Sequence, residues 1–184
     1  MNEVPAGTAL LNSELLEPVS VALLANLMLE RGLFMATAES CTGGMIAAAC
    51  TDLAGSSAWF ERGFVTYSNA AKTDMLGVDA ALIAQHGAVS EAVARAMAFG
   101  AIRHSTAQVS VAVTGVAGPA GGSIDKPVGT VWFAWSISGN LHSEIQSFSG
   151  DRSRVRQATV QHAISKLLTL LEKNLPWQAG AKTL

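Results

Sequence analysis

The sequence predicts an α/β protein, folded as a three-layer α/β/α sandwich around a mixed, mostly parallel sheet of about five strands. Two observations support this fold class. Through the first two thirds of the chain, short apolar runs alternate with segments of helical periodicity, which is typical of parallel strands joined by crossover helices. Later, two β runs are separated only by residues 138–140, Ser-Gly-Asn, which predicts a hairpin and hence one antiparallel strand.

The elements follow from local patterns. Val19, Leu23 and Leu27 form an apolar stripe that predicts a helix over 19–30, with Gly32 as its C-cap. Ser90 before Glu91 predicts a helix N-terminus. Further helices are expected at 42–53, 70–76, 80–86, 90–103 and 151–174, the last with a stripe at Val155, Ile164, Leu167, Leu168 and Leu171. Strands are expected at 33–38, 60–67, 109–114, 129–137 and 141–148.

Length and composition limit the class of protein. The 184 residues suit one domain, and we expect an N-terminal arm over 1–18 followed by a single domain over 19–184. Charged residues make up 14% of the chain, against about 25% in ordinary soluble domains, and the net charge is −2. This composition argues against disorder and against a nucleic-acid partner, and it favours a surface partly covered by a second copy, as in a homodimer.

Targeting signals and metal ligands are not evident in the sequence. Residues 1–16 contain Glu3 and Glu14 but no Lys or Arg, so they lack the basic start of a secretory signal. The early apolar stretch, 19–29, is too short to span a bilayer. If Cys41 and Cys50 both lie on the expected helix, they are separated by roughly 13 Å, which is too far for a disulfide, so we expect reduced thiols. Neither has a histidine at ligand spacing, so we expect no metal site. The simplest expectation is a cytoplasmic protein without a membrane partner.

The first cluster of polar residues lies where the first strand should turn into a helix, at 37–44. Ser40 stands close to two glycines there, and the unpaired amides of a helix start favour a phosphate or a developing oxyanion. Ser40 is therefore a candidate nucleophile, with Cys41 as a competitor. The alternative is that Ser40 or Thr42 only caps the helix.

The second cluster, at 65–72, follows the next strand and should lie at the same edge of the sheet. A lysine that is desolvated there has a lowered pKa and can serve as the general base for a serine, which makes Lys72 a candidate. Tyr67 could relay a proton or orient the lysine. The alternative is that Lys72 is an exposed helix lysine and Tyr67 a strand-end aromatic residue.

Two more segments could hold a ligand. The span 114–130 is a long glycine-rich loop, but it has neither the P-loop nor the dinucleotide-binding spacing. Arg152, Arg154 and Arg156 lie close together in the chain, and arginine binds phosphate through two parallel hydrogen bonds. The alternatives are a flexible surface loop and a solvated helix face paired with Asp151.

The ordered blocks AESCTGG, GFVTYSNAAK with LGV, GAVS, TGVAGPAGG with KPVGTV, and GDRSRVR resemble the C-terminal domain family of the competence/damage-inducible protein CinA. The resemblance runs from about Val19 to Leu171. The family includes stand-alone nicotinamide mononucleotide deamidases, so it implies hydrolysis of that carboxamide to nicotinate mononucleotide and ammonia, in pyridine nucleotide recycling. No metal or cofactor is implied, and the expected partner is a small-molecule nucleotide substrate.

The resemblance also implies roles for single residues. Ser40 would be the nucleophile, Lys72 the base that activates it, and Tyr67 a supporting acid/base or orienting group. Arg154 would meet the phosphate. The other expected substrate-binding residues are Glu39, Thr42, Gly43, Gly44, Thr114, Gly115 and Gly118. Two alternatives stay open: a nucleotide-binding module without turnover, and a serine hydrolase of another amide.

Overall fold

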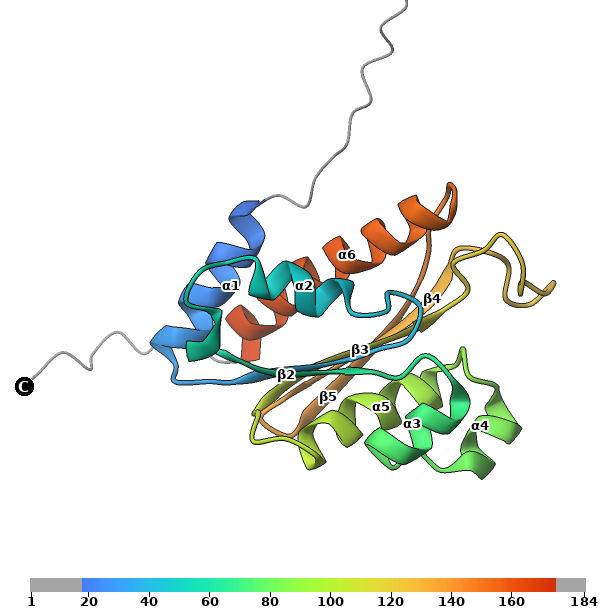
Figure 1. The fold of residues 1–184 in the computed structure, drawn as a ribbon, viewed down its shortest axis with the longest axis horizontal. Helices are drawn as coiled ribbons and strands as arrows, with labels where there is room; N and C mark the ends of the chain where they lie inside the picture. The colour runs from blue at the N-terminus through green and yellow to red at the C-terminus, as the bar shows by residue number, and fades with distance from the viewer. Residues whose placement is uncertain (1–17, 175–184) are drawn as a thin grey trace, which may run out of the picture.

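A central sheet lies between two layers of helices, as Figure 1 shows for residues 18–174, the part of the chain that the structure, a computed structural model, describes. The strands are β1 (Met35–Glu39), β2 (Phe60–Val65), β3 (Val109–Gly115), β4 (Thr130–Ile137) and β5 (Asn140–Ser147). They pair in the order β2-β1-β3-β4-β5, and only β4 runs against the direction of the others. The predicted three-layer fold with a mixed, mostly parallel sheet is confirmed.

The helices divide between the two faces of the sheet. One face carries α1 (Pro18–Glu30), α2 (Met45–Thr51) and α6 (Arg152–Asn174), with a short 3-10 turn at Ser56–Ala58 before β2. The other face carries α3 (Asn69–Leu76), α4 (Ala80–His86) and α5 (Glu91–Arg103). The helix after β1 and the helices after β2 therefore leave the sheet on opposite sides, which opens a crevice at the carboxyl ends of these strands.

The core consists of two apolar layers, one on each face. Successive strand residues point to opposite faces, so Met35 packs beneath α1 and α6 while its neighbour Ala36 packs beneath α5. Trp135 is fully buried on the α6 side, where its indole Nε1 donates to the carbonyl of Ala163 at 3.0 Å. This bond satisfies the only polar group of a large buried ring.

Close packing in the second layer fixes α3 relative to α5. Gly100 of α5 faces the end of α3, and a Cβ atom at that position would lie 2.2 Å from the carbonyl oxygen of Leu76. Any larger residue would push the helices apart. Ser68 caps α3, because its Oγ accepts a hydrogen bond from the amide of Ala71 at 3.0 Å. The helix that carries Lys72 is thus held at both ends.

Some predicted details are wrong. The buried stripe of α1 is Val21, Leu24, Ala25 and Met28, whereas Leu23 is 51% exposed. That helix is apolar around most of its circumference, so periodicity could not identify the packed face. The predicted stripe of α6 is confirmed, with Val155, Ile164, Leu167 and Leu171 buried and Leu168 partly so.

Of the predicted arm, 1–17 lies outside the described residues, and α1 already begins at Pro18. The helix expected from Thr42 begins only at Met45, because the preceding turn is held by Glu39, which accepts from the amides at the start of the helix. Across residues 18–174, no helix is both long and apolar enough to cross a membrane.

Candidate functional site

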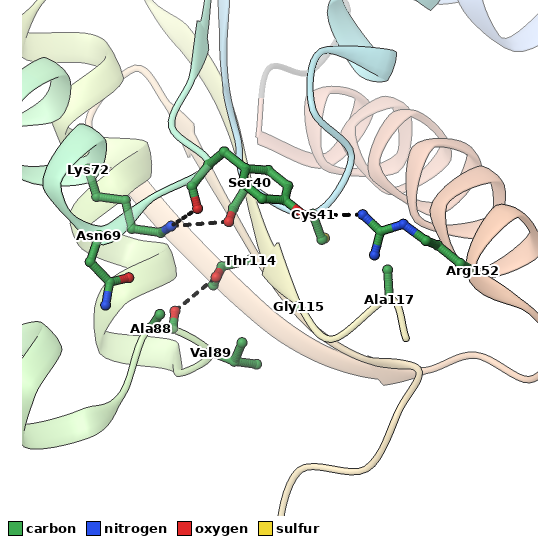
Figure 2. Close-up of a pocket in the computed structure, with 11 residues that line it drawn as sticks. Ser40, Cys41, Asn69, Lys72, Ala88, Val89, Thr114, Gly115, Ala117 and Arg152 are labelled. Carbon is green, nitrogen blue, oxygen red and sulfur yellow. Dashed lines mark hydrogen bonds between the residues drawn. The ribbon is translucent and has the colours of Figure 1, made fainter. Parts of the chain in front are cut away.

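A pocket of about 210 Å³ lies at the carboxyl ends of β1 and β3, where the crevice between the two helical layers opens. This volume is smaller than the ~300–1,000 Å³ of pockets that enclose a whole ligand, so it fits a reacting group with the rest of a ligand outside. Figure 2 shows the lining residues. They are Ser40, Cys41, Tyr67, Asn69, Lys72, Ala88, Val89, Thr114, Gly115, Ala117 and Arg152.

Ser40 and Lys72 meet inside this pocket. Ser40 follows β1 and is 8% exposed, whereas Lys72 comes from α3 and is 1% exposed. The Lys72 Nζ lies 3.1 Å from the Ser40 Oγ, 2.9 Å from the carbonyl oxygen of Thr66 and 3.4 Å from that of Tyr67. Burial lowers the pKa of Lys72, because the ammonium form loses its hydration. The pair has the arrangement of a nucleophile with an adjacent base.

The turn that carries Ser40 is held from within by Glu39. This carboxylate is fully buried and accepts from the Thr42 hydroxyl at 2.7 Å and from three backbone amides, those of Gly44, Ile46 and Ala47. The first amides of α2 are therefore paired inside the protein and are not offered to a phosphate or an oxyanion, contrary to the expectation. Neither Ser40 nor Thr42 is the N-cap, which is Gly44 with φ of 99°.

Arg156 of α6 holds the same turn from the other side. Its Nε donates to the carbonyl oxygen of Cys41 at 3.1 Å, and its Nη2 donates to that of Thr42 at 2.7 Å. Gly43 lies beside it with φ of 61°, a left-handed conformation that glycine adopts without strain. An anion and a cation thus fix the backbone around Ser40, which orients the side chain for reaction.

Tyr67 contacts Lys72 through its main chain and Arg152 through its side chain. Its backbone carbonyl accepts a hydrogen bond from Lys72. The residue as a whole is 62% exposed, and its hydroxyl accepts a hydrogen bond from Arg152 Nη2 at 3.2 Å. Arg152 Nη1 also donates to the carbonyl oxygen of Gly118 at 2.9 Å. In Figure 2 this guanidinium lies on the opposite side of Ser40 from Lys72. Arg152 is therefore the cation of the pocket rim, whereas Arg154 is exposed and does not line the pocket.

The wall opposite Ser40 comes from the turn between α4 and α5. The Thr114 hydroxyl donates to the carbonyl oxygen of Ala88 at 2.8 Å, which holds this turn against β3. Lys126, from the glycine-rich loop, donates through Nζ to the carbonyl oxygen of His86 at 3.0 Å. Both interactions fix the position of Ala88 and Val89 in the pocket.

Cys41 does not compete well as a nucleophile. Burial raises the pKa of its thiol to about 11, so the thiol is protonated at neutral pH and the reactive thiolate is scarce. Cys41 and Cys50 are both free and buried, in agreement with the expectation of reduced thiols. Cys41 lies in the turn before α2 and not on the helix itself.

The structure brings together only some of the expected residues. Ser40, Lys72, Tyr67, Thr114 and Gly115 line the pocket. The remaining expected substrate-binding residues do not: Glu39, Thr42, Gly43, Gly44, Gly118 and Arg154. Sequence reasoning missed other lining residues, namely Asn69, Ala88, Val89 and Ala117, and it preferred Arg154 to Arg152. Asn69 lies three residues before Lys72 on α3, so helical spacing alone could have suggested it.

Within residues 18–174, no three His, Cys, Asp or Glu side chains are grouped so that they could hold a metal ion. The side chains that line the pocket include the hydroxyl of Ser40, the amine of Lys72 and the guanidinium of Arg152. These groups can attack, transfer a proton and bind an anion.

Known proteins resemble this chain over most of its length. Nicotinamide-nucleotide amidohydrolase PncC of Escherichia coli K12 is 52% identical over 155 residues, which cover 84% of this chain and 91% of that protein. The protein of the same name from Pseudomonas putida is 58% identical over 134 residues, covering 73% and 84%.

Solved structures show the same fold. A competence/damage inducible protein from Agrobacterium tumefaciens superposes with a TM-score of 0.80 at 46% identity, covering 83% of this chain and 94% of that one. A CinA superfamily protein from Klebsiella pneumoniae gives 0.82 at 38% identity, covering 85% and 98%. The sequence profile of the CinA C-terminal domain matches residues 19–171. This chain therefore belongs to the CinA C-terminal domain family.

Proposed function

We propose that this protein hydrolyses the carboxamide of nicotinamide mononucleotide to nicotinate mononucleotide and ammonia, with Ser40 as the nucleophile and Lys72 as its base. The observation that carries the proposal is the 3.1 Å approach of Lys72 Nζ to Ser40 Oγ in a buried position. The names of the relatives from Escherichia coli and Pseudomonas putida support the substrate class.

The surroundings of Lys72 suit a base. A neutral amine has two hydrogens and one lone pair, and the carbonyls of Thr66 and Tyr67 are placed to accept the two hydrogens. The lone pair is then directed at Ser40. The described residues form no ion pair with Lys72 that would hold its proton. Burial keeps the amine neutral and so able to accept a proton, and the two carbonyls stabilise the ammonium that forms when Lys72 takes the proton of the Ser40 hydroxyl.

The proposed reaction has two halves. Lys72 takes the hydroxyl proton while Ser40 Oγ bonds to the carboxamide carbon, and the resulting ammonium returns that proton to the departing nitrogen, which leaves as ammonia. Water then attacks the acyl ester, with Lys72 accepting its proton and returning it to Ser40 Oγ. The products are the carboxylate and the free enzyme. Arg152, at the rim of the pocket, is the residue we assign to the substrate phosphate.

Ammonia release from nicotinamide mononucleotide tests the proposal. We expect Ser40→Ala to lose at least about 10³-fold in kcat, because removal of a nucleophile has effects of this size or larger. Ser57→Ala is the matched control, since that serine is exposed and lies outside the pocket. Equal activity of the wild type and Ser40→Ala would exclude Ser40 as nucleophile. A ligand-dependent rise in Tm without ammonia would indicate a binding module, and preference for a different amide would indicate another hydrolase.

A further inference from the structure

Tyr67 presents two different groups to two different parts of the pocket. Only its main-chain carbonyl reaches Lys72, whereas its phenol hydroxyl lies 3.2 Å from Arg152 Nη2. Tyr67 is 62% exposed as a residue, in contrast to the buried Lys72, so its side chain belongs to the outer part of the pocket. The hydrogen bond of the phenol is therefore to the guanidinium, whereas Lys72 is bonded by Tyr67 only through the main chain.

The hydrogen bonding at the rim leaves donors free. A phenol oxygen that accepts from a guanidinium keeps its own hydrogen for another acceptor. Arg152 uses one nitrogen for Gly118 and another for Tyr67, and a guanidinium carries five N–H donors. Arg152 is also the first residue of α6, whose 23 residues direct a positive dipole end toward the same place. Tyr67 and Arg152 therefore present adjacent donors to an anion.

We propose that Tyr67 is a specificity residue, which pairs with Arg152 to bind the phosphate of the substrate and does not relay protons to Ser40. The inference rests on the proposed function for the identity of the substrate, but it assigns Tyr67 to the rim and not to the chemistry. A phosphate dianion accepts hydrogen bonds from a guanidinium and a hydroxyl at the same time. Loss of either donor weakens recognition of the phosphorylated substrate.

Tyr67→Phe, which removes only the hydroxyl, tests this assignment kinetically. We expect kcat/KM for nicotinamide mononucleotide to fall about tenfold, mainly through a higher KM. The ratio of kcat/KM for nicotinamide mononucleotide to kcat/KM for nicotinamide riboside should fall by the same factor. Phe99→Leu is the control, because this ring is exposed on α5 outside the pocket. A kcat that falls equally for both substrates would show a proton relay and overturn the proposal.

The sequence contains a single tyrosine, which allows a second test without turnover. Protein labelled with 3-fluorotyrosine should give one ¹⁹F NMR resonance, from Tyr67. We expect ribose 5-phosphate to shift this resonance in the wild type and in Ser40→Ala, and not in Arg152→Ala. An equal shift with unphosphorylated ribose, or none at saturating ribose 5-phosphate, would overturn the proposal. Because this readout needs no hydrolysis, a failure of the proposed activity is distinguished from a failure of this assignment.

Discussion

Lys72 shows how one side chain acquires its chemistry from its surroundings. Its length lets Nζ reach from α3 across the pocket to the end of β1, and its burial disfavours the charged form. Arginine could form similar hydrogen bonds, but it has no lone pair to accept a proton near neutral pH. The role therefore depends on an amine and not on a positive charge.

The pH dependence of hydrolysis tests this role. Below the pKa of Lys72 the amine holds a proton and cannot activate Ser40, so kcat/KM should rise with pH along a limb set by Lys72. Because burial lowers this pKa, the midpoint should fall below the ordinary lysine value of about 10.4. Ammonia release between pH 5 and 10 measures the limb. Lys72→Arg should be inactive throughout, and activity in that variant would contradict the assignment.

The three arginines of α6 show what residue spacing can decide. Arg152 and Arg156 are four residues apart and lie on one face of the helix, where one reaches the pocket and the other the Ser40 turn. Arg154 lies between them in sequence and so points away. Buried Val155, Val160 and Ala163 mark the packed face, and together they lie on the side of the helix that carries Arg152 and Arg156. Which of that pair reaches the rim depends on tertiary packing and cannot be predicted locally.

The start of α2 shows why element boundaries were harder to predict than element types. A serine and a threonine before a run of small residues predict a side-chain cap, but the N-cap is Gly44, and the first amides of the helix donate to the Glu39 carboxylate at the end of the preceding strand. This arrangement delays the helix to Met45 and leaves Ser40 free to face the pocket. Strand and helix order, in contrast, followed directly from hydrophobic patterns.

Glu39→Gln tests the stabilising role of this carboxylate. An amide has one acceptor oxygen where the carboxylate has two, so some of the four donors lose their charged partner. We expect the free energy of unfolding to fall by about 2–3 kcal/mol, which corresponds to the loss of one or two hydrogen bonds to a charged group. Urea unfolding measures the change. Glu61→Gln is the control: it removes an ion pair with the exposed Arg62, and we expect it to change stability much less than Glu39→Gln.

His162 of α6 packs among the aromatic rings of Phe133, Trp135 and Phe148 on one face of the sheet. The His162 ring centroid lies 4.8 Å from that of Phe133, and its Nε2 lies 3.1 Å from Glu144 Oε1. Burial lowers the pKa of His162, and Lys166 adds to this effect, while Glu144 opposes it. The folded protein therefore resists protonation of this side chain more than the unfolded chain does.

This difference predicts an effect of pH on the stability of the fold. Since the unfolded chain binds the proton more readily, stability should fall as the pH drops below about 6.5, the ordinary histidine pKa. Urea unfolding at pH 7.5 and 5.5 measures the loss, which His162→Gln should reduce. His86→Gln is the control, because that side chain is exposed. A loss of equal size in wild type and His162→Gln would assign it to other groups.

At the scale of the whole molecule, the site depends on topology. Ser40 follows β1 and Lys72 follows β2, and the helices after these adjacent parallel strands cover opposite faces. The order of strands and helices in the sequence was enough to expect both residues at one sheet edge. Their contact distance was not, because it depends on the close packing of α3 on α5. The homodimer expected from the low charge content stays a prediction.

The Ser40–Lys72 contact joins two structural layers that share no covalent link other than the sheet between them. The rate of hydrolysis then depends directly on whether the layer of α3, α4 and α5 is packed in place on the sheet. A partial opening of that layer would abolish activity while most secondary structure persists, because sub-global openings require less free energy than complete unfolding. Inactivation by denaturant should consequently precede the loss of helical circular dichroism. Substitutions at Gly100, which does not line the pocket, should reduce catalysis before they reduce helical content.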